Sequence, residues 1–170
     1  IVAITGSCGK TTVKELLGNV LSKITKVSIS PKSYNNKFGV PLSLFNLKQN
    51  DEFGILEVGM DKKGEIDYLS KIIEPDVGVI TNINYAHAKN FKNIKQIALA
   101  KSEIINNIKP NGYVVLNADD SYFQLHKKIA KEKKIRVVSF GIKNQKSEIK
   151  LINIKTFGKK FKINIRLNNK

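Results

Sequence analysis

Short apolar runs alternate with segments of helical periodicity along most of the chain. The run at residues 1–5 is followed by a segment, 11–24, whose apolar residues recur at the spacing of one helix face. These apolar residues are Val13, Leu16, Leu17, Val20, Leu21 and Ile24. The pattern predicts a strand followed by an amphipathic helix.

The same alternation continues downstream. It predicts strands at 53–57, 77–82, 113–117 and 135–140, and helices at 64–73, 94–108 and 122–133. Because repeated strand-helix units build parallel sheets, the predicted fold is α/β: a mainly parallel, doubly wound sheet with helices on both faces. The runs 1–4, 77–80 and 113–116 are apolar throughout, as expected for strands that helices cover on both faces.

The pattern changes after Gly141. Apolar residues alternate with polar ones in 149–154 and again in 161–167, on either side of Gly158-Lys159-Lys160, which predicts an antiparallel hairpin appended to the sheet. We see no internal repeat and no low-complexity linker, so we expect one domain over residues 1–170. The chain begins inside an apolar run without methionine, and we therefore expect it to be a piece of a longer polypeptide.

A glycine-rich turn lies between the first predicted strand and the first predicted helix. It reads Thr5-Gly-Ser-Cys-Gly-Lys-Thr-Thr12, a shortened phosphate-loop motif, since the usual pattern has glycine where Ile4 stands. Glycines allow a tight turn that aims N–H groups at a polyphosphate, the lysine reaches terminal phosphates, and the hydroxyl of Thr11 can bind Mg²⁺. The predicted nucleotide-binding residues here are Gly6, Ser7, Cys8, Gly9, Lys10, Thr11 and Thr12.

Composition and charge limit the functional classes. The apolar fraction of 41% is ordinary for a folded domain, and a single cysteine excludes a disulfide within the chain. We find no signal-peptide pattern and no long apolar run, so we expect a cytoplasmic protein without membrane insertion. The net charge of +16 raises nucleic-acid binding as an alternative, but the lysines are scattered over nearly every segment. We interpret the charge as compositional bias and expect no nucleic-acid partner.

Polar side chains follow three of the predicted strands. In open α/β sheets ligands bind beyond the carboxyl ends of the strands, so these positions are candidate site residues. Glu57 is a candidate Mg²⁺ ligand or an ordinary surface carboxylate. His87 is a candidate metal or phosphate ligand or an ordinary loop histidine. Asn117 either contacts the nucleotide or caps the helix that follows.

Lys101 interrupts an apolar helix face. The other residues of that face are Ile94, Ile97, Ala98, Ile104, Ile105 and Ile108. The lysine either extends to the helix edge or is buried, and a buried lysine can lose its proton and become reactive, for example toward CO₂. The loop 32–41 carries Asn35 and Asn36 before a predicted helix, and it either binds substrate or phosphate or forms an ordinary Asx-rich turn.

Seven short motifs, in this order and spacing, resemble the central domain of the Mur ligases. They are Thr5–Thr12, Asn35-Asn36-x-x-Gly39-Val-Pro41, Glu57-Val-Gly59, Gly64-Glu65-Ile66, Asn82 with Ala86-His87, Ala100-Lys101-x-Glu103-Ile104 and Asn117-Ala-Asp119. The resemblance covers about the first 140 residues. Within the family it is nearest to the member that joins D-alanyl-D-alanine to a UDP-N-acetylmuramoyl-tripeptide.

The resemblance implies an ATP-dependent, Mg²⁺-dependent ligase that forms an acyl phosphate during synthesis of peptidoglycan precursors. It implies that Lys10 stabilises the transferring phosphoryl group, that Thr11, Glu57 and His87 serve the metal site, and that Asn35 and Asn36 bind substrate. It further implies that Lys101 is carbamylated and supports a second Mg²⁺. Lys10, His87 and Lys101 are thus the expected catalytic residues.

The resemblance also sets limits. Mur ligases have three domains, so residues 1–170 would be an incomplete central ATP-binding domain, monomeric and inactive in isolation. Two alternatives remain open at this point: another carboxylate-amine ligase of the superfamily, such as the third-residue-adding ligase or a folylpolyglutamate synthase, and a P-loop ATPase that is not a ligase.

Overall fold

The computed structural model describes residues 1–85, 90–158 and 160–168. Its strands are β1 (Val2–Thr5), β2 (Val27–Ile29), β3 (Phe53–Glu57), β4 (Val77–Ile80), β5 (Tyr113–Asn117), β6 (Arg136–Gly141), β7 (Ile149–Phe157) and β8 (Lys160–Leu167). Its helices are α1 (Lys10–Leu21), α2 (Gly39–Phe45), α3 (Glu65–Ile73), α4 (Ile94–Ser102), the 3₁₀ helix η2 (Glu103–Asn107) and α5 (Phe123–Glu132). The predicted alternation of strands and helices is confirmed.

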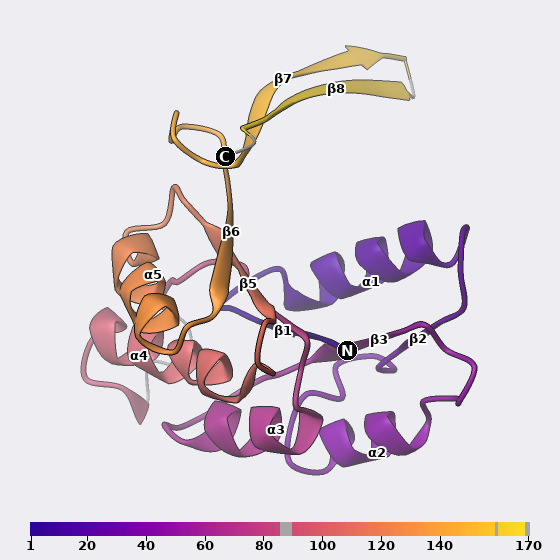
Figure 1. Cartoon of the computed structure of the whole chain (residues 1–170), viewed down its shortest axis with the longest axis vertical. Helices are drawn as coiled ribbons and strands as arrows, with labels where there is room; N and C mark the ends of the chain where they lie inside the picture. The colour runs from indigo at the N-terminus through magenta and orange to yellow at the C-terminus, as the bar shows by residue number, and fades with distance from the viewer. Residues whose placement is uncertain (86–89, 159, 169–170) are drawn as a thin grey trace.

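The strands form one mixed sheet with the order β2-β3-β1-β4-β5-β6-β7-β8. All neighbouring pairs from β2 to β7 are parallel, and β7 and β8 pair antiparallel. Figure 1 shows the β7–β8 hairpin projecting from the body of the molecule. The mainly parallel sheet and the hairpin both agree with the sequence pattern.

Helices pack on both faces of the sheet, but unevenly. Among the described residues, α1 alone covers one face, where its apolar side chains meet Val2, Ile4, Ile55 and Val79. On the other face, α2, α3, α4, η2 and α5 bury the larger core. Figure 1 shows α1 on the opposite side of the sheet from α2 and α3.

The expectation that helices cover both faces of 113–116 is wrong for the described part of the chain. Val115 is only half-buried and Tyr113 is 38% exposed, because α1 does not reach across β5. An apolar groove therefore remains open between α1 and the strands β4 to β6. Its lining includes Val13, Leu17, Val77, Val115 and Phe140.

Two further elements differ from the sequence prediction. The strand β2 was not predicted, because Val27-Ser28-Ile29 is too short to show an alternating pattern, and its pairing with β3 defines it. The predicted helix 94–108 divides into α4 and η2 after Ser102. The hydroxyl of Ser102 donates to the carbonyl oxygen of Leu99, a local bond of the kind that competes with the regular helix ladder.

The order of the strands positions the site. The chain passes from β1 to the edge strand β2, returns through β3 and then crosses over β1 to β4, so the direction of strand addition reverses at β1, the switch point of the sheet. Ligands of open α/β sheets bind in the crevice beyond the carboxyl ends of the strands at such a point. The glycine-rich turn after β1, the end of β3 and the end of β4 all lie there.

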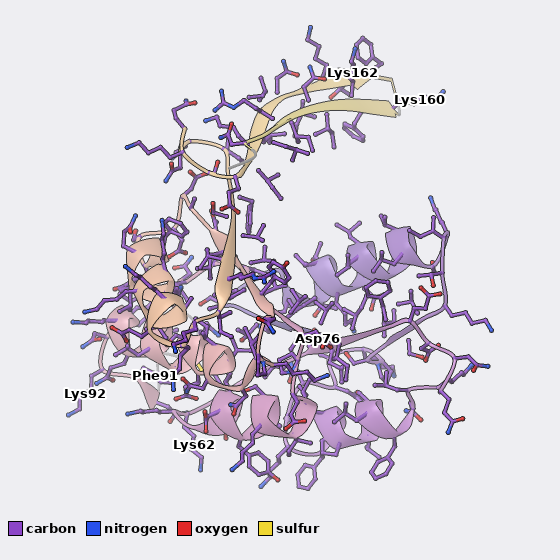
Figure 2. The ribbon with its side chains drawn as sticks, viewed as in Figure 1. Lys62, Asp76, Phe91, Lys92, Lys160 and Lys162 are labelled. Carbon is purple, nitrogen blue, oxygen red and sulfur yellow. The ribbon has the colours of Figure 1, made fainter. Side chains whose placement is uncertain are left out.

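At the opposite ends of the strands, hydrogen bonds hold the start of β1 against the start of β4. Nζ of Lys109 lies 3.2 Å from a carboxylate oxygen of Asp76. Figure 2 labels Asp76 at this end of the strands. The backbone N–H groups of Asp76 and Val77 both donate to the carbonyl oxygen of Ile1, which fixes the start of β1 against β4.

No helix in the described part of the chain is both long and apolar enough to span a lipid bilayer.

Candidate functional site

The glycine-rich turn has a backbone that requires glycine at two positions. Gly6 has φ +145° and Gly9 has φ +79°. A Cβ atom at Gly6 would lie 1.9 Å from Oγ1 of Thr81, so the turn passes against the end of β4 without room for a side chain. At Gly9 the surrounding space is open, and only the backbone conformation favours glycine.

The end of β4 holds this turn in place. Ser7 N donates to the carbonyl of Asn82 over 2.9 Å, and Cys8 N donates to Oδ1 of Asn82 over 3.1 Å. The hydroxyl of Thr81 donates to the carbonyl of Cys8, and that of Ser7 to the carbonyl of Asn84. The N–H groups of Ser7 and Cys8 thus have acceptors already. A phosphate could bind them only by replacing the two oxygen atoms of Asn82 as the acceptor.

The start of α1 has the properties of an anion site. Gly9 is the residue before the helix, and no side chain caps the N–H groups of the first turn, which contains Thr11 and the exposed Thr12. Nζ of Lys10 donates to the carbonyl of Gly6 over 3.0 Å, so its charge lies over the turn. Open helix N–H groups beside a lysine fit a phosphate group.

Glu57 connects three segments of the chain at the end of β3. Its Oε2 accepts a hydrogen bond from the hydroxyl of Thr11, and its Oε1 accepts one from Nδ2 of Asn35, each over 2.7 Å. The residue is 1% exposed. A buried carboxylate with two directed donors is held in one orientation.

Gly59 makes room for Asn35. The N–H of Gly59 donates to the carbonyl of Asn35 over 2.7 Å, and a Cβ at Gly59 would lie 2.8 Å from the side chain of Asn35. Asn36 has a different position: its Oδ1 accepts from the N–H groups of Phe38 and Gly39 at the start of α2. Sequence reasoning identified both asparagines but not that one orients Glu57 and the other caps a helix.

The oxygen donors at Thr11 and Glu57 fit a magnesium ion by their chemistry. Mg²⁺ prefers oxygen ligands and is usually bound by one or two protein groups together with substrate phosphates. Among the described residues no group of three or more His, Cys, Asp or Glu side chains could hold a metal alone. A hydroxyl and a carboxylate beside an anion site match the shared kind of magnesium site, in which phosphate supplies the remaining ligands.

Lys101 lies on α4 and is 1% exposed, so the interpretation as a buried lysine is confirmed and the extended one is wrong. Burial, which has the largest effect, and the positive charge of Lys10 together lower the pKa of Lys101 to about 7, against a smaller opposite effect of Cys8. The influence of Lys10 and Cys8 means that the lysine approaches the glycine-rich turn from the helical layer. At neutral pH a substantial fraction of this amine is therefore uncharged and nucleophilic.

Two predicted site residues, His87 and Asn117, are not among the contacts described above. His87 lies outside the described residues. Asn117 ends β5, and its Oδ1 accepts from the N–H of Asp119 over 3.0 Å, which is a local turn contact. Its nucleotide contact stays a prediction. Thr81, Asn82 and Asn84 are the residues whose part in shaping the glycine-rich turn sequence reasoning missed, although a polar run directly after a strand could have indicated it.

A pocket of about 640 Å³ opens beside Lys10 and Asn35. Its rim contains Lys37, Lys62 and Lys63, and Figure 2 shows Lys62 extending outward near α3. Basic side chains around a pocket favour an anionic ligand. Asp61 and Glu65 also line it, so the pocket offers acceptors as well as cations.

The fold and this cluster define an α/β domain with a glycine-rich anion site at the switch point of its sheet. Residues 4–170 match the family model described as the Mur ligase middle domain. The chain belongs to this family.

Known relatives agree with the family assignment. The chain is 43% identical over 146 residues to the UDP-N-acetylmuramoyl-tripeptide–D-alanyl-D-alanine ligase of Buchnera aphidicola from Acyrthosiphon pisum, which covers 86% of this chain and 32% of that protein. It resembles a crystal structure of MurF from Acinetobacter baumannii with a TM-score of 0.89 and 33% identity, over 98% of this chain and 36% of that one. MurF of Thermotoga maritima in complex with ADP gives a TM-score of 0.81 and 29% identity, over 96% and 37%. The chain thus spans about a third of the length of these relatives.

Proposed function

We propose that the intact protein containing this chain is an ATP-dependent ligase that joins D-alanyl-D-alanine to UDP-N-acetylmuramoyl-tripeptide. The observation that carries the proposal is the pairing of Glu57 with Thr11 beside the glycine-rich turn, in a chain whose relatives bear that name. The reaction would take place in the cytoplasm, as a step in the synthesis of peptidoglycan precursors.

The reaction has two chemical steps. An oxygen of the tripeptide carboxylate attacks the γ-phosphorus of ATP, and ADP leaves, so an acyl phosphate forms. The amine of D-alanyl-D-alanine then attacks the acyl carbon, inorganic phosphate leaves with the former carboxylate oxygen, and the amine loses one proton. Phosphoryl transfer of this kind is accelerated mainly by positioning and by charge neutralisation.

The chain supplies groups for both needs. Lys10 would move from the carbonyl of Gly6 to the transferring phosphoryl group and offset its negative charge. The N–H groups of the first turn of α1 would hold the β-phosphate, with further contacts from the turn residues Gly6 to Gly9. Asn117 would contact the nucleotide from the end of β5. The lysine-rimmed pocket beside Asn35 and Asn36 would receive the anionic UDP-linked substrate.

Thr11 and Glu57 would hold Mg²⁺, together with His87. When bound, Mg²⁺ would neutralise phosphate charge and fix the geometry of the phosphates. Asn35 would keep Glu57 in the orientation that its present hydrogen bond defines.

Lys101 would serve as a carbamate. Its uncharged amine would attack the carbon of CO₂, form an N–C bond and release one proton, which turns a buried cation into an anion close to Lys10. Such an anion is a suitable partner for a second Mg²⁺. The low pKa of Lys101 supports this role, because the neutral amine is the reactive form.

Residues 1–170 would form the central ATP-binding domain of a monomeric protein that has further domains for the UDP-linked substrate and for the nucleotide base. The proposal therefore expects the chain to be inactive in isolation. The length of the relatives supports it.

The test is ADP release by the intact protein with ATP, Mg²⁺ and UDP-N-acetylmuramoyl-tripeptide. The proposal predicts release with D-alanyl-D-alanine and not with single amino acids. Release with a single amino acid would favour the third-residue-adding ligase or a folylpolyglutamate synthase. Release that no acceptor or substrate changes would favour a P-loop ATPase.

A further inference from the structure

Lys14 is a fully buried lysine that the proposed function does not use. It lies on α1 one turn after Lys10, and its residue exposure is 0%. Its Nζ donates to the carbonyl oxygen of Ser30 over 2.6 Å and to that of Lys32, and lies 3.2 Å from Oε1 of Glu15. An ammonium group has three N–H donors, so these three acceptors satisfy it completely.

The two carbonyl groups belong to the loop between β2 and α2. The loop leaves the sheet at Ser30 and turns at Lys32, whose φ of +47° is unusual for a residue with a side chain. The opposite end of the loop is fixed where Asn36 caps α2. Lys14 therefore fixes the first half of the loop that carries Asn35.

The same loop holds Glu57 at two points. Oγ of Ser30 accepts a hydrogen bond from the backbone N–H of Glu57 over 3.2 Å. Nδ2 of Asn35 donates to the carboxylate over 2.7 Å. The third contact of Glu57, from Thr11, comes from α1, the helix that carries Lys14.

These contacts form a closed ring. It runs from α1 through the ammonium of Lys14 to the β2–α2 loop, through Asn35 to Glu57, and through Thr11 back to α1. In a closed ring of directed hydrogen bonds, the position of each member depends on the others.

We propose that Lys14 is a positioning residue that sets the Mg²⁺ affinity of the nucleotide site by fixing the loop through which Asn35 orients Glu57. The inference rests on the proposed role of Glu57 as a magnesium ligand. Because Lys14 is fully buried, it would contact neither nucleotide nor substrate. Residues that orient metal ligands change metal affinity by roughly 10- to 100-fold when they are replaced.

The chain offers a matched control. Lys150 is also a buried lysine, with 5% exposure, and its Nζ also donates to two backbone carbonyls, those of Ile142 and Lys143, over 2.9 and 3.3 Å. That loop follows β6, and its N–H groups at Ile142 and Lys143 donate to the carboxylate of Asp119. Lys14→Met and Lys150→Met thus remove the same chemical group from the same kind of environment.

The experiment measures ADP binding to the intact protein by calorimetry while the Mg²⁺ concentration is varied. Lys14→Met is expected to raise the Mg²⁺ concentration for half-maximal binding about tenfold. Lys150→Met is expected to leave it unchanged. An unchanged Mg²⁺ requirement in a folded Lys14→Met protein would overturn the proposal, because it would show a role in stability alone.

A double variant tests whether Lys14 affects the Mg²⁺ requirement through Asn35. If Lys14 acts through Asn35, adding Lys14→Met to Asn35→Ala raises the Mg²⁺ requirement little beyond that of Asn35→Ala. Effects that multiply would overturn the proposal. Lys14→Gln keeps an amide NH₂ group with two N–H donors and is measured in the same way if Lys14→Met does not fold.

The outcome is independent of the ligase reaction. Binding of ADP and Mg²⁺ needs neither the tripeptide nor an acceptor. A protein that releases ADP only with D-alanyl-D-alanine but keeps its Mg²⁺ affinity in Lys14→Met would refute the role of Lys14 and retain the proposed function. A protein whose ADP release does not depend on D-alanyl-D-alanine, but whose Mg²⁺ affinity falls in Lys14→Met, would retain the role of Lys14 and refute the proposed function.

Discussion

The hydroxyl of Thr11 donates to Oε2 of Glu57 over 2.7 Å, which joins the first turn of α1 to the end of β3. The two residues lie 46 positions apart in the sequence. Parallel pairing of β1 with β3 brings them together, because it places the turn after β1 beside the residue that ends β3. The order of the strands thus brings together the hydroxyl and the carboxylate that are the candidate Mg²⁺ ligands.

Replacement of Glu57 tests this chemistry. Glu57→Gln keeps the size of the side chain but removes the negative charge, so we expect the Mg²⁺ concentration for half-maximal ADP binding to rise by at least roughly tenfold. Glu52→Gln, an exposed substitution just before the same strand, is the control and should have no effect. An equal Mg²⁺ requirement in both variants would remove Glu57 from the metal site.

Alanine at the two glycines of the turn should have different consequences. Gly9→Ala has open space around it and is strained only by its left-handed backbone, so we expect a loss of about 1–2 kcal/mol in the free energy of unfolding. Gly6→Ala would clash with Thr81 in addition and should cost more, and it should also weaken ADP binding. Denaturant unfolding and calorimetry measure both effects, and a smaller cost at Gly6 than at Gly9 would contradict the turn geometry.

The sequence predicted most of the fold because most of its strands are either apolar throughout or largely alternating. The pattern at 53–57 and 113–117 matches β3 and β5 to the residue. It could not predict β2, which depends on pairing with β3 and not on its own three residues. It also could not show that α1 leaves part of β5 open, because the position of a helix across a sheet is a property of packing.

The candidate site was predictable in its members but not in its contacts. The types of Thr11, Glu57 and Lys101 and their positions after strands or on an apolar face were visible in the sequence. Lys14 was not, because a lysine next to Glu15 in a helix is typical of a solvated surface. The β2–α2 loop, which lies over α1, supplies the carbonyl groups of Ser30 and Lys32 that its ammonium group meets.

The carbamate of Lys101 can be detected without turnover, and its role can be tested by turnover. The intact protein with ¹³C-labelled bicarbonate should show a carbamate carbon signal by NMR, and Lys101→Ala should abolish both this signal and ADP release while keeping the fold. Lys95→Ala, an exposed change on the same helix, should keep both. Full ligation by folded Lys101→Ala would exclude the lysine from the mechanism.

The lowered pKa of Lys101 predicts a pH dependence of stability. Between about pH 7 and 10.5 the unfolded chain holds a proton on this amine that the folded protein has lost, so Lys101 makes stability rise with pH in that window. Below about pH 7 both states hold the proton, and the contribution is constant and unfavourable. In CO₂-free buffer, Lys101→Met should therefore be stabilised most, relative to the unchanged protein, below pH 7. A difference that is the same at pH 6 and pH 9 would contradict the low pKa.

The central claim is that this domain serves a ligase that works through an acyl phosphate. It is tested most directly with UDP-N-acetylmuramoyl-tripeptide labelled with ¹⁸O in the reacting carboxylate, added with ATP, Mg²⁺ and D-alanyl-D-alanine to the intact protein. The account predicts that one ¹⁸O atom appears in the inorganic phosphate for each amide bond formed. Amide formation that leaves the phosphate unlabelled, or ATP cleavage without an amide product, would contradict it.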